Sequence, residues 1–117
     1  MIDIVLPEQE YVHFEDDGKR ITVCTLRQKV LHTIGLRMNG GNRGRLYTRH
    51  GKKYYKPYRN YFSGNDKDLD GLVEAGYMDM DSREVHGIPD YRSYWFNRKG
   101  LDWLGEQIGI YIYDEED

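Results

Sequence analysis

The residues with the clearest chemical potential form a basic, tyrosine-rich segment in the first half of the chain. Cationic side chains alternate with tyrosines between positions 43 and 61. Lysine and arginine neutralise phosphates and aromatic rings stack on bases, so this combination is typical of surfaces that bind nucleic acid, single strands in particular. The residues that we expect to make these contacts are Arg43, Arg45, Arg49, Lys52, Lys53, Tyr55, Lys56 and Arg59.

The distribution of charge sets this segment apart from the rest of the 117 residues. The net charge is only −3, yet residues 18–65 contain 12 lysines and arginines and no acid. Residues 1–17 contain six acids and no base, and residues 66–117 contain 14 acids and five bases. A basic block of this size either attracts a polyanion or is neutralised by acidic parts of the same chain or of a partner protein.

A second group of charges favours a protein partner instead of nucleic acid. Acidic residues cluster in a helix that we expect over residues 66–75, where the helix N-terminus stabilises negative charge. Together with the acidic tail, residues 114–117, they could imitate nucleic acid toward a basic protein. In this alternative the chain is a protein-binding module, such as an inhibitor of a host defence or transcription protein. The residues that carry it are Asp66, Asp68, Asp70 and Glu74.

No catalytic or metal-binding pattern is present in the sequence. The four histidines are scattered, Cys24 is the only cysteine, and no CxxC, HxxxH or HExxH spacing occurs. Residues 66–71 match the first half of an EF-hand loop, but the twelfth position is Tyr77 where that loop needs a glutamate. We therefore expect no enzyme, no metal site and no cofactor, and we interpret Cys24 as a small core residue.

The N-terminal 24 residues predict strands. Residues 2–6 alternate weakly, as in a short edge strand. Tyr11–Phe14 and Ile21–Val23 are rich in β-formers and flank Asp17-Gly18, a pair that favours tight hairpin turns. We expect this segment to be a β-hairpin extension that precedes the main domain.

A helix is predicted from Thr25 onward. Thr25 and Gln28 have the spacing of a capping box, in which two otherwise unpaired backbone donors are satisfied. An apolar stripe runs from Leu26 to Met38, and Asn39-Gly40-Gly41 is the expected stop. Residues 42–58 show no helical period, and a short basic hairpin with its turn at His50-Gly51 is our first interpretation, with an ordered loop as the second.

The second half predicts alternating helices and strands. Asp66 begins the acidic helix, and Gly76 ends it. The expected elements that follow are a strand over 77–80, a turn-rich loop over 81–90, a strand over 91–96, a helix capped by Asn97 and stopped by Gly109, and a β-prone segment over 110–113.

This order of elements resembles a winged helix. In that fold a helix ends in a glycine, a strand follows, a wing loop turns, and a second strand delivers an aromatic residue before another helix. The matching residues here are Leu72, Val73, Gly76, Tyr77, Tyr94, Phe96, Asn97 and Gly100. The helix that would enter a DNA groove, residues 66–75, has a net charge of −3, so the resemblance favours the fold more than groove reading by that helix.

More narrowly, residues 25–113 resemble small proteins of phages and prophages. The resemblance rests on four segments: Ile34-Gly35-Leu36, residues 58–62, Leu72–Met78, and Asn97–Gly100 followed by Leu104. It implies a winged-helix-like fold, and it transfers no catalytic or binding residue to this chain.

These observations together predict an α+β, winged-helix-like domain over residues 25–113, preceded by the hairpin extension, residues 1–24, and followed by the acidic tail. We expect a small phage-type accessory or regulatory protein that contacts nucleic acid through its basic segment. The single cysteine fits a reducing compartment and the apolar start is too short for a signal peptide, so we expect a soluble, intracellular protein. The resemblance to phage proteins implies that its location is the cytoplasm of a host bacterium. We expect nucleic acid or a host protein as the partner, and no contact with a membrane. The chain itself is expected to be a monomer or a homodimer.

Overall fold

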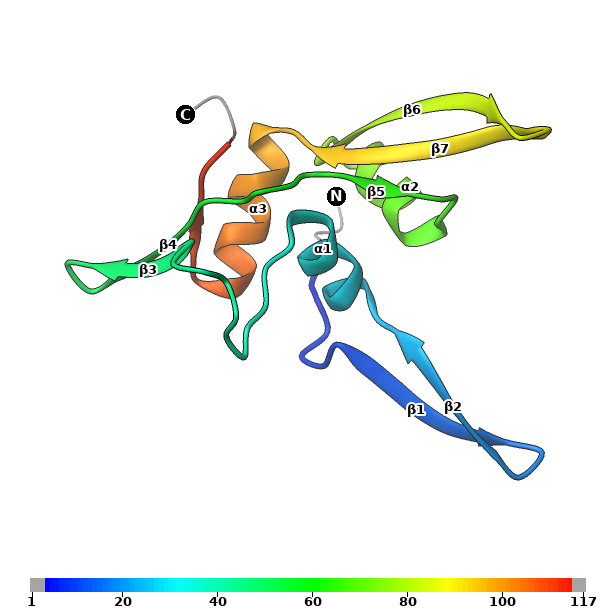
Figure 1. The fold of residues 1–117 in the computed structure, drawn as a ribbon, viewed down its shortest axis with the longest axis horizontal. Coiled ribbons are helices and arrows are strands. Elements are labelled where there is room, and N and C mark those ends of the chain that lie inside the picture. The colour runs from blue at the N-terminus through cyan, green and yellow to red at the C-terminus, as the bar shows by residue number, and fades with distance from the viewer. Residues whose placement is uncertain (1–3, 115–117) are drawn as a thin grey trace.

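The computed structural model describes residues 4–114, which fold into an α+β arrangement of three helices and eight strands (Figure 1). The α+β class predicted from the sequence is therefore confirmed. In chain order the elements are β1 (Tyr11–Asp16), β2 (Lys19–Cys24), α1 (Leu26–Ile34), β3 (Leu46–Arg49), β4 (Lys52–Tyr55), β5 (Phe62–Ser63), α2 (Lys67–Glu74), β6 (Met78–Val85), β7 (Ile88–Phe96), α3 (Arg98–Ile108) and β8 (Tyr111–Ile112).

One hydrophobic core joins all three helices to two of the three sheets. The helices contribute most of the aliphatic side chains, and the strands contribute buried aromatic residues and methionine. The core is built mainly from Val30, Leu31, Ile34, Tyr55, Leu69, Leu72, Met78, Tyr94, Phe96, Leu101, Leu104 and Ile112. Hairpins extend outward from this centre in different directions, and the Cα radius of gyration of 15.6 Å exceeds the value of about 13 Å typical of a compact domain near this size.

Helix α1 is shorter than the sequence pattern predicts. Its cap is Thr25, whose Oγ1 accepts a hydrogen bond from the Gln28 backbone N–H at 3.4 Å. The Thr25 N–H donates to the Glu10 carbonyl at 2.9 Å, so the reciprocal half of the predicted capping box is absent. The helix ends at Ile34 because Gly35 adopts a left-handed φ of 70°, well before the stop expected at residues 39–41.

Strand β7 is the centre of a three-stranded antiparallel sheet, with β5 on one side and β6 on the other. The loop predicted over residues 81–90 is wrong, because β6 continues to Val85 and β7 begins at Ile88. The turn is only His86-Gly87, and both residues have positive φ, 50° and 77°. Cross-strand hydrogen bonding therefore extends this hairpin through a segment whose sequence is rich in turn-forming residues.

Two glycines let helix α3 approach its neighbours closely. A Cβ at Gly100 would lie 1.8 Å from the Tyr77 carbonyl oxygen, so only glycine fits against the start of β6. A Cβ at Gly105 would lie 2.5 Å from the Ile110 carbonyl oxygen. Gly105 lies within α3 without interrupting it, and it makes room for the chain to fold back along the helix into β8.

Strand β8 converts the β3–β4 hairpin into a three-stranded sheet. The hairpin is confirmed, with its turn at His50 (φ 53°) and Gly51 (φ 78°). Strand β8 pairs parallel to β4, with Tyr111 beside Tyr54 and Ile112 beside Tyr55. The Tyr113 N–H continues the ladder by donating to the Tyr55 carbonyl at 3.0 Å.

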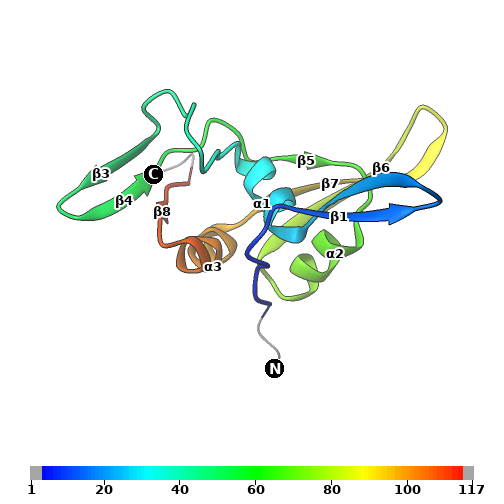
Figure 2. The same cartoon turned by 90° about the horizontal axis from the view of Figure 1, so that it is seen from below.

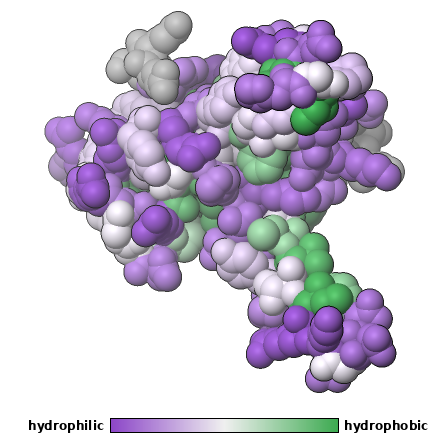
Figure 3. All heavy atoms as spheres, turned by 45° about the vertical axis from the view of Figure 1, so that its right-hand side comes forward, coloured by the Kyte–Doolittle hydropathy of each residue, from purple (hydrophilic) through white to green (hydrophobic). Residues whose placement is uncertain are grey.

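The β1–β2 hairpin, which we call the arm, extends away from the rest of the molecule (Figure 3). It is confirmed, and its turn residues Asp17 and Gly18 have positive φ of 52° and 76°. Cys24, at its base, is exposed, so the expectation of a core cysteine is wrong. The edge strand expected over residues 2–6 is absent at residues 4–6, and positions 2 and 3 lie outside the described residues.

Candidate nucleic-acid interface

The outer face of the β3–β4–β8 sheet brings together tyrosines that are far apart in the sequence. The three strands lie side by side at one end of the molecule (Figure 2). Residues paired across a ladder project to the same side, and neighbours along a strand project to opposite sides. The inner face carries side chains that pack in the core, namely Leu46, Tyr55 and Ile112. The outer face consequently carries Tyr47, Tyr54 and Tyr111.

Four tyrosines form one cluster here, which we call the tyrosine platform: Tyr47, Tyr54, Tyr111 and Tyr113. The rings of Tyr47 and Tyr54 are stacked, with centroids 5.5 Å apart and an interplanar angle of 18°. The ring of Tyr54 also lies 6.0 Å from that of Tyr111 and 6.2 Å from that of Tyr113. The Tyr47 hydroxyl donates to the Tyr113 hydroxyl at 3.4 Å.

Two rows of cations flank the stacked tyrosine pair along the hairpin. Arg49 and Lys52 face each other in the register toward the turn, and we call them the outer cation row. Arg45 and Lys56 form the inner cation row at the other end, where the Lys56 N–H donates to the Arg45 carbonyl at 2.9 Å. Because a strand rises about 3.4 Å per residue, each row lies about 7 Å from the tyrosine pair. Positive charge therefore stands on both sides of an aromatic surface.

Cations also lie directly over the platform rings. The Lys56 ammonium is 5.5 Å from the centroid of the Tyr113 ring. The guanidinium of Arg98, from the start of α3, is 5.4 Å from that of Tyr111. Its Nη2 also donates to the Ile112 carbonyl at 2.5 Å, which ties the helix to β8. These contacts hold the aromatic rings in place by cation–π attraction.

The basic segment is not neutralised by ion pairs within residues 4–114. The salt bridges found there involve the cations Lys29, Arg83, Arg92 and Arg98. None involves a lysine or arginine between positions 37 and 59. The two cation rows are also exposed, so their charge faces solvent.

A hollow of about 460 Å³, which we call the arginine hollow, adjoins the inner cation row. Its walls include Arg37, Arg43, Arg45 and Tyr58. The side-chain amide of Asn42 shapes the loop, since its Oδ1 accepts from the Arg37 N–H at 2.9 Å and its Nδ2 donates to the Arg37 carbonyl at 2.7 Å. The Arg45 guanidinium lies 5.6 Å from the centroid of the Tyr58 ring. The hollow therefore combines guanidinium groups that form no salt bridge within residues 4–114 with an exposed ring.

Three residues of the expected binding set lie elsewhere. Tyr55 is fully buried and its hydroxyl donates to the Ile34 carbonyl at 2.8 Å, so its inclusion in a surface site is wrong. Lys53 pairs with Thr48 and projects to the side opposite the platform. Arg59 is half-buried, and its Nη2 donates to the Tyr61 carbonyl at 2.7 Å. The remaining expected residues lie in the cation rows or the hollow: Arg43, Arg45, Arg49, Lys52 and Lys56.

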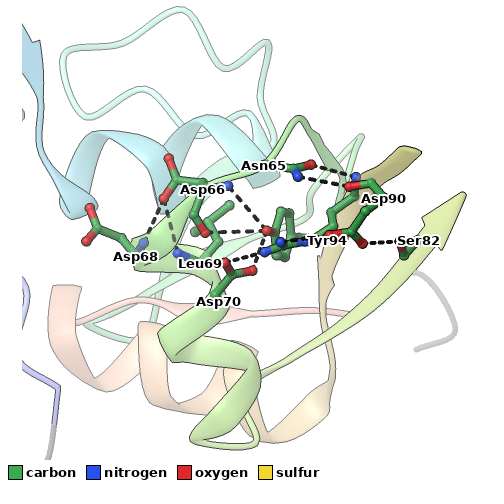
Figure 4. A network of polar contacts seen from close by, with 9 residues as sticks. Asn65, Asp66, Asp68, Leu69, Asp70, Ser82, Asp90 and Tyr94 are labelled. Atoms are coloured by element: carbon green, nitrogen blue, oxygen red, sulfur yellow. Dashed lines mark hydrogen bonds and ion pairs between the residues drawn. The ribbon is translucent and has the colours of Figure 1, made fainter. Parts of the chain in front are cut away.

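The acids expected to bind a partner protein are largely engaged inside the molecule (Figure 4). The Asp66 carboxylate caps α2 by accepting from the Asp68 N–H at 2.9 Å, and the Lys29 ammonium lies 2.9 Å from Asp66 and 3.0 Å from Asp68. Partial burial opposes protonation of Lys29, but these two hydrogen bonds outweigh it and raise the pKa of Lys29. On this helix, Glu74 is exposed and forms no ion pair with the described residues.

Asp70 completes this network on the side of α2 that faces β7. It forms an ion pair with Arg92 and accepts a hydrogen bond from the buried Tyr94 hydroxyl at 2.5 Å. The hydrogen bond from Arg92 is the main reason why the pKa of Asp70 is lowered. Asp90 is a second partner of Arg92, at 3.0 Å. Asp66, Asp68 and Asp70 thus attach α2 to its neighbours, whereas Glu74 does not.

The sequence interpretation missed the part of the site that comes from the C-terminal segment. Tyr111, Tyr113 and Arg98 lie within the acidic half of the chain, outside the basic, tyrosine-rich segment on which the sequence interpretation relied. The available signal was the alternation Tyr111-Ile112-Tyr113, which predicts a strand with one apolar and one aromatic face. The pairing partner of that strand was not predictable from the alternation alone.

Comparisons with protein-family models, curated proteins and solved structures gave no match to this chain. Across residues 4–114, no helix has both the length and the apolar composition needed to cross a bilayer. The same residues contain no group of three or more histidine, cysteine, aspartate or glutamate side chains arranged to hold a metal ion.

Proposed function

We propose that this chain is a non-enzymatic accessory or regulatory protein that binds single-stranded nucleic acid through the tyrosine platform and its cation rows. The observation that carries the proposal is the arrangement of cations on both sides of a stacked tyrosine pair, none of them in a salt bridge with residues 4–114. Cations contact the phosphates, and exposed ring surfaces stack on unpaired bases. Each stacked base contributes about 1–3 kcal/mol to binding. Such a surface binds many sequences, because every base has a face that can stack.

The shape of the site favours a single strand over a duplex. The platform lies on the face of a sheet, and bases reach a ring face only when they are not paired and stacked within a double helix. The α2 helix does not supply an alternative duplex-reading surface, because its carboxylates repel phosphate and are engaged with Lys29 and Arg92. We therefore expect single strands to bind more tightly than duplexes of the same length.

We further propose that residues 25–113 are a winged-helix-like domain of the phage type. The support is the hairpin β6–β7, which lies between α2 and α3 and forms a sheet with β5 in the order β5–β7–β6. In this proposal the β3–β4 hairpin and β8 are additions, and nucleic acid binds to the additions instead of to a helix. The same elements carry the tyrosine platform.

Two neighbouring lysines provide a matched test of the proposed surface. Lys52 belongs to the outer cation row, whereas Lys53 projects to the opposite side of the same strand. Fluorescence anisotropy with labelled single-stranded DNA and RNA should show several-fold weaker binding for Lys52→Ala and little change for Lys53→Ala. Equal losses for the two variants would contradict binding on the platform side of the sheet.

A tyrosine variant tests stacking separately from charge. Tyr111 is 46% exposed at the edge of the platform, so its replacement leaves the core intact. Loss of one stacking contact of about 1–3 kcal/mol predicts roughly 5- to 150-fold weaker binding for Tyr111→Ala. Unchanged affinity would show that the rings do not contact bases. Absence of any binding at low salt would refute the proposed function and direct the search to protein partners.

A further inference from the structure

The arm has one polar and one apolar face. Cross-strand partners in its register share a face, so Val12 lies beside Val23 and Phe14 beside Ile21 on one side. These four residues are the apolar face of the arm. The other side carries His13 and Thr22, whose side chains hydrogen-bond at 2.9 Å, together with Tyr11, Cys24, Glu15 and Arg20.

The apolar face is not covered by any described part of the chain. Val12, Phe14 and Val23 are 49%, 47% and 46% exposed, and the spheres of Figure 3 show apolar residues along the arm between the body of the molecule and a hydrophilic tip. A two-stranded hairpin without further packing is at best marginally stable in water. Burying this face would stabilise the arm, because apolar surface would leave water and the strands would gain a second layer.

We propose that this face packs against the same face of a second copy of the chain, with the two-fold axis running along the arms. Such a rotation places β1 of one arm over β2 of the other. Val12 of each copy then faces Val23 of the other, and Phe14 faces Ile21. The two symmetry-related halves of the interface therefore make the same apolar contacts. Both copies contribute the same surface, and this surface is self-complementary, as a two-fold interface requires.

Charge at the tip selects this orientation. Asp16 and Lys19 are cross-strand partners on the apolar side, next to Phe14 and Ile21. With the axis along the arms, Asp16 of each copy faces Lys19 of the other, which gives two opposite-charge pairs. The antiparallel stacking, in which β1 lies over β1, instead brings Asp16 over Glu10 at the base of the partner arm. Like charges in contact disfavour that alternative.

The size of the face predicts a reversible association. A hairpin with six residues in each strand offers a face of roughly 20 Å by 10 Å, from the strand rise and the distance between strands. That is well below the about 800 Å² per partner of a standard stable interface. We therefore expect monomer and dimer to exchange, with a dissociation constant in the micromolar range or weaker.

The first experiment is sedimentation equilibrium of the full chain over a wide concentration range at moderate salt. A mass that rises toward two chains is expected for the unmodified protein. Phe14→Asp should remain a monomer, whereas His13→Asp, which adds the same charge at the adjacent position on the polar face, should still associate. A protein that stays monomeric throughout, or equal behaviour of the two variants, would overturn the proposal.

A charge-exchange experiment separates association from folding of the arm. Asp16→Lys places two cations at each tip, and Lys19→Asp places two anions there, so neither variant should associate with itself. A mixture of the two should form a heterodimer, because every tip charge then faces its opposite. Both variants lose the cross-strand pair within their own arm, and mixing cannot restore it. Failure of the mixture to associate when the unmodified chain does would overturn the proposed orientation.

Discussion

The salt dependence of binding tests the cation rows quantitatively. The rows contain Arg45, Arg49, Lys52 and Lys56, and none of the four forms a salt bridge with residues 4–114. For single strands, each phosphate contact contributes about −0.7 to the slope of log affinity against log salt concentration. Four contacts predict a slope of about −2.8, so raising salt from about 50 to about 200 mM should weaken binding about 50-fold.

Removing the outer cation row should halve that slope. The double variant Arg49→Ala/Lys52→Ala retains two contacts, which predicts a slope of about −1.4 and only about a 7-fold loss over the same salt range. Anisotropy titrations with a labelled oligonucleotide of mixed sequence provide the affinities. The matched control is Lys19→Ala/Arg20→Ala, which removes the same charge from the distant tip of the arm.

The control decides how a change in slope is interpreted. We expect the slope of the arm variant to equal that of the unmodified protein, since the arm does not contact the strand in this proposal. An unchanged slope in Arg49→Ala/Lys52→Ala would refute direct phosphate contacts by the outer cation row. Equal reductions in the two double variants would mean that net charge, rather than this surface, drives binding.

Two further predictions concern the scaffold of the site. Gly100→Ala should destabilise the fold by about 1–3 kcal/mol or more in chemical denaturation, because its Cβ would meet the Tyr77 carbonyl oxygen at 1.8 Å. The control Gly71→Ala, in α2 with open space around it, should instead stabilise the fold by about 0.5–1 kcal/mol. Similar losses of stability in both variants would contradict the close approach of α3. Because Arg92 lowers the pKa of Asp70 below its ordinary value of 3.8, the carboxylate stabilises the folded state above that pH, and this contribution disappears as pH falls through the lowered value. Asp70→Asn should accordingly be less stable than the unmodified protein at neutral pH, with the difference shrinking below about pH 4 in thermal unfolding; a gap independent of pH would contradict this assignment.

Local sequence signals predicted many of the boundaries. Asp17-Gly18 and His50-Gly51 each form the expected hairpin turn, because residues that tolerate positive φ decide a two-residue turn without help from the rest of the chain. Asn97 caps α3 as expected, and Asp66, expected as the first residue of the acidic helix, caps α2. Both side-chain oxygens accept hydrogen bonds from backbone N–H groups two or three residues ahead. These interactions are short-range, so a few adjacent residues determine where each turn or helix begins.

Predictions failed where a distant partner decides. The segment 81–90 has turn-forming composition, yet cross-strand pairing carries β6 and β7 almost to the His86-Gly87 turn. Cys24 was expected in the core, but its strand belongs to an arm without a covering layer. In both cases the local pattern is compatible with two structures, and packing selects between them.

For the candidate site, the sequence by itself determined the cations and tyrosines of the basic segment, and it favoured a hairpin there over an ordered loop. Only the tertiary structure decided which face those residues share. The parallel pairing of β8 with β4 places Tyr111 beside Tyr54, and it buries Tyr55 against the core with Ile112. Strands β4 and β8 are distant in the chain, and they pair because pairing buries the apolar side of both. Burial of that side leaves the tyrosines and the two cation rows on the opposite side, facing outward.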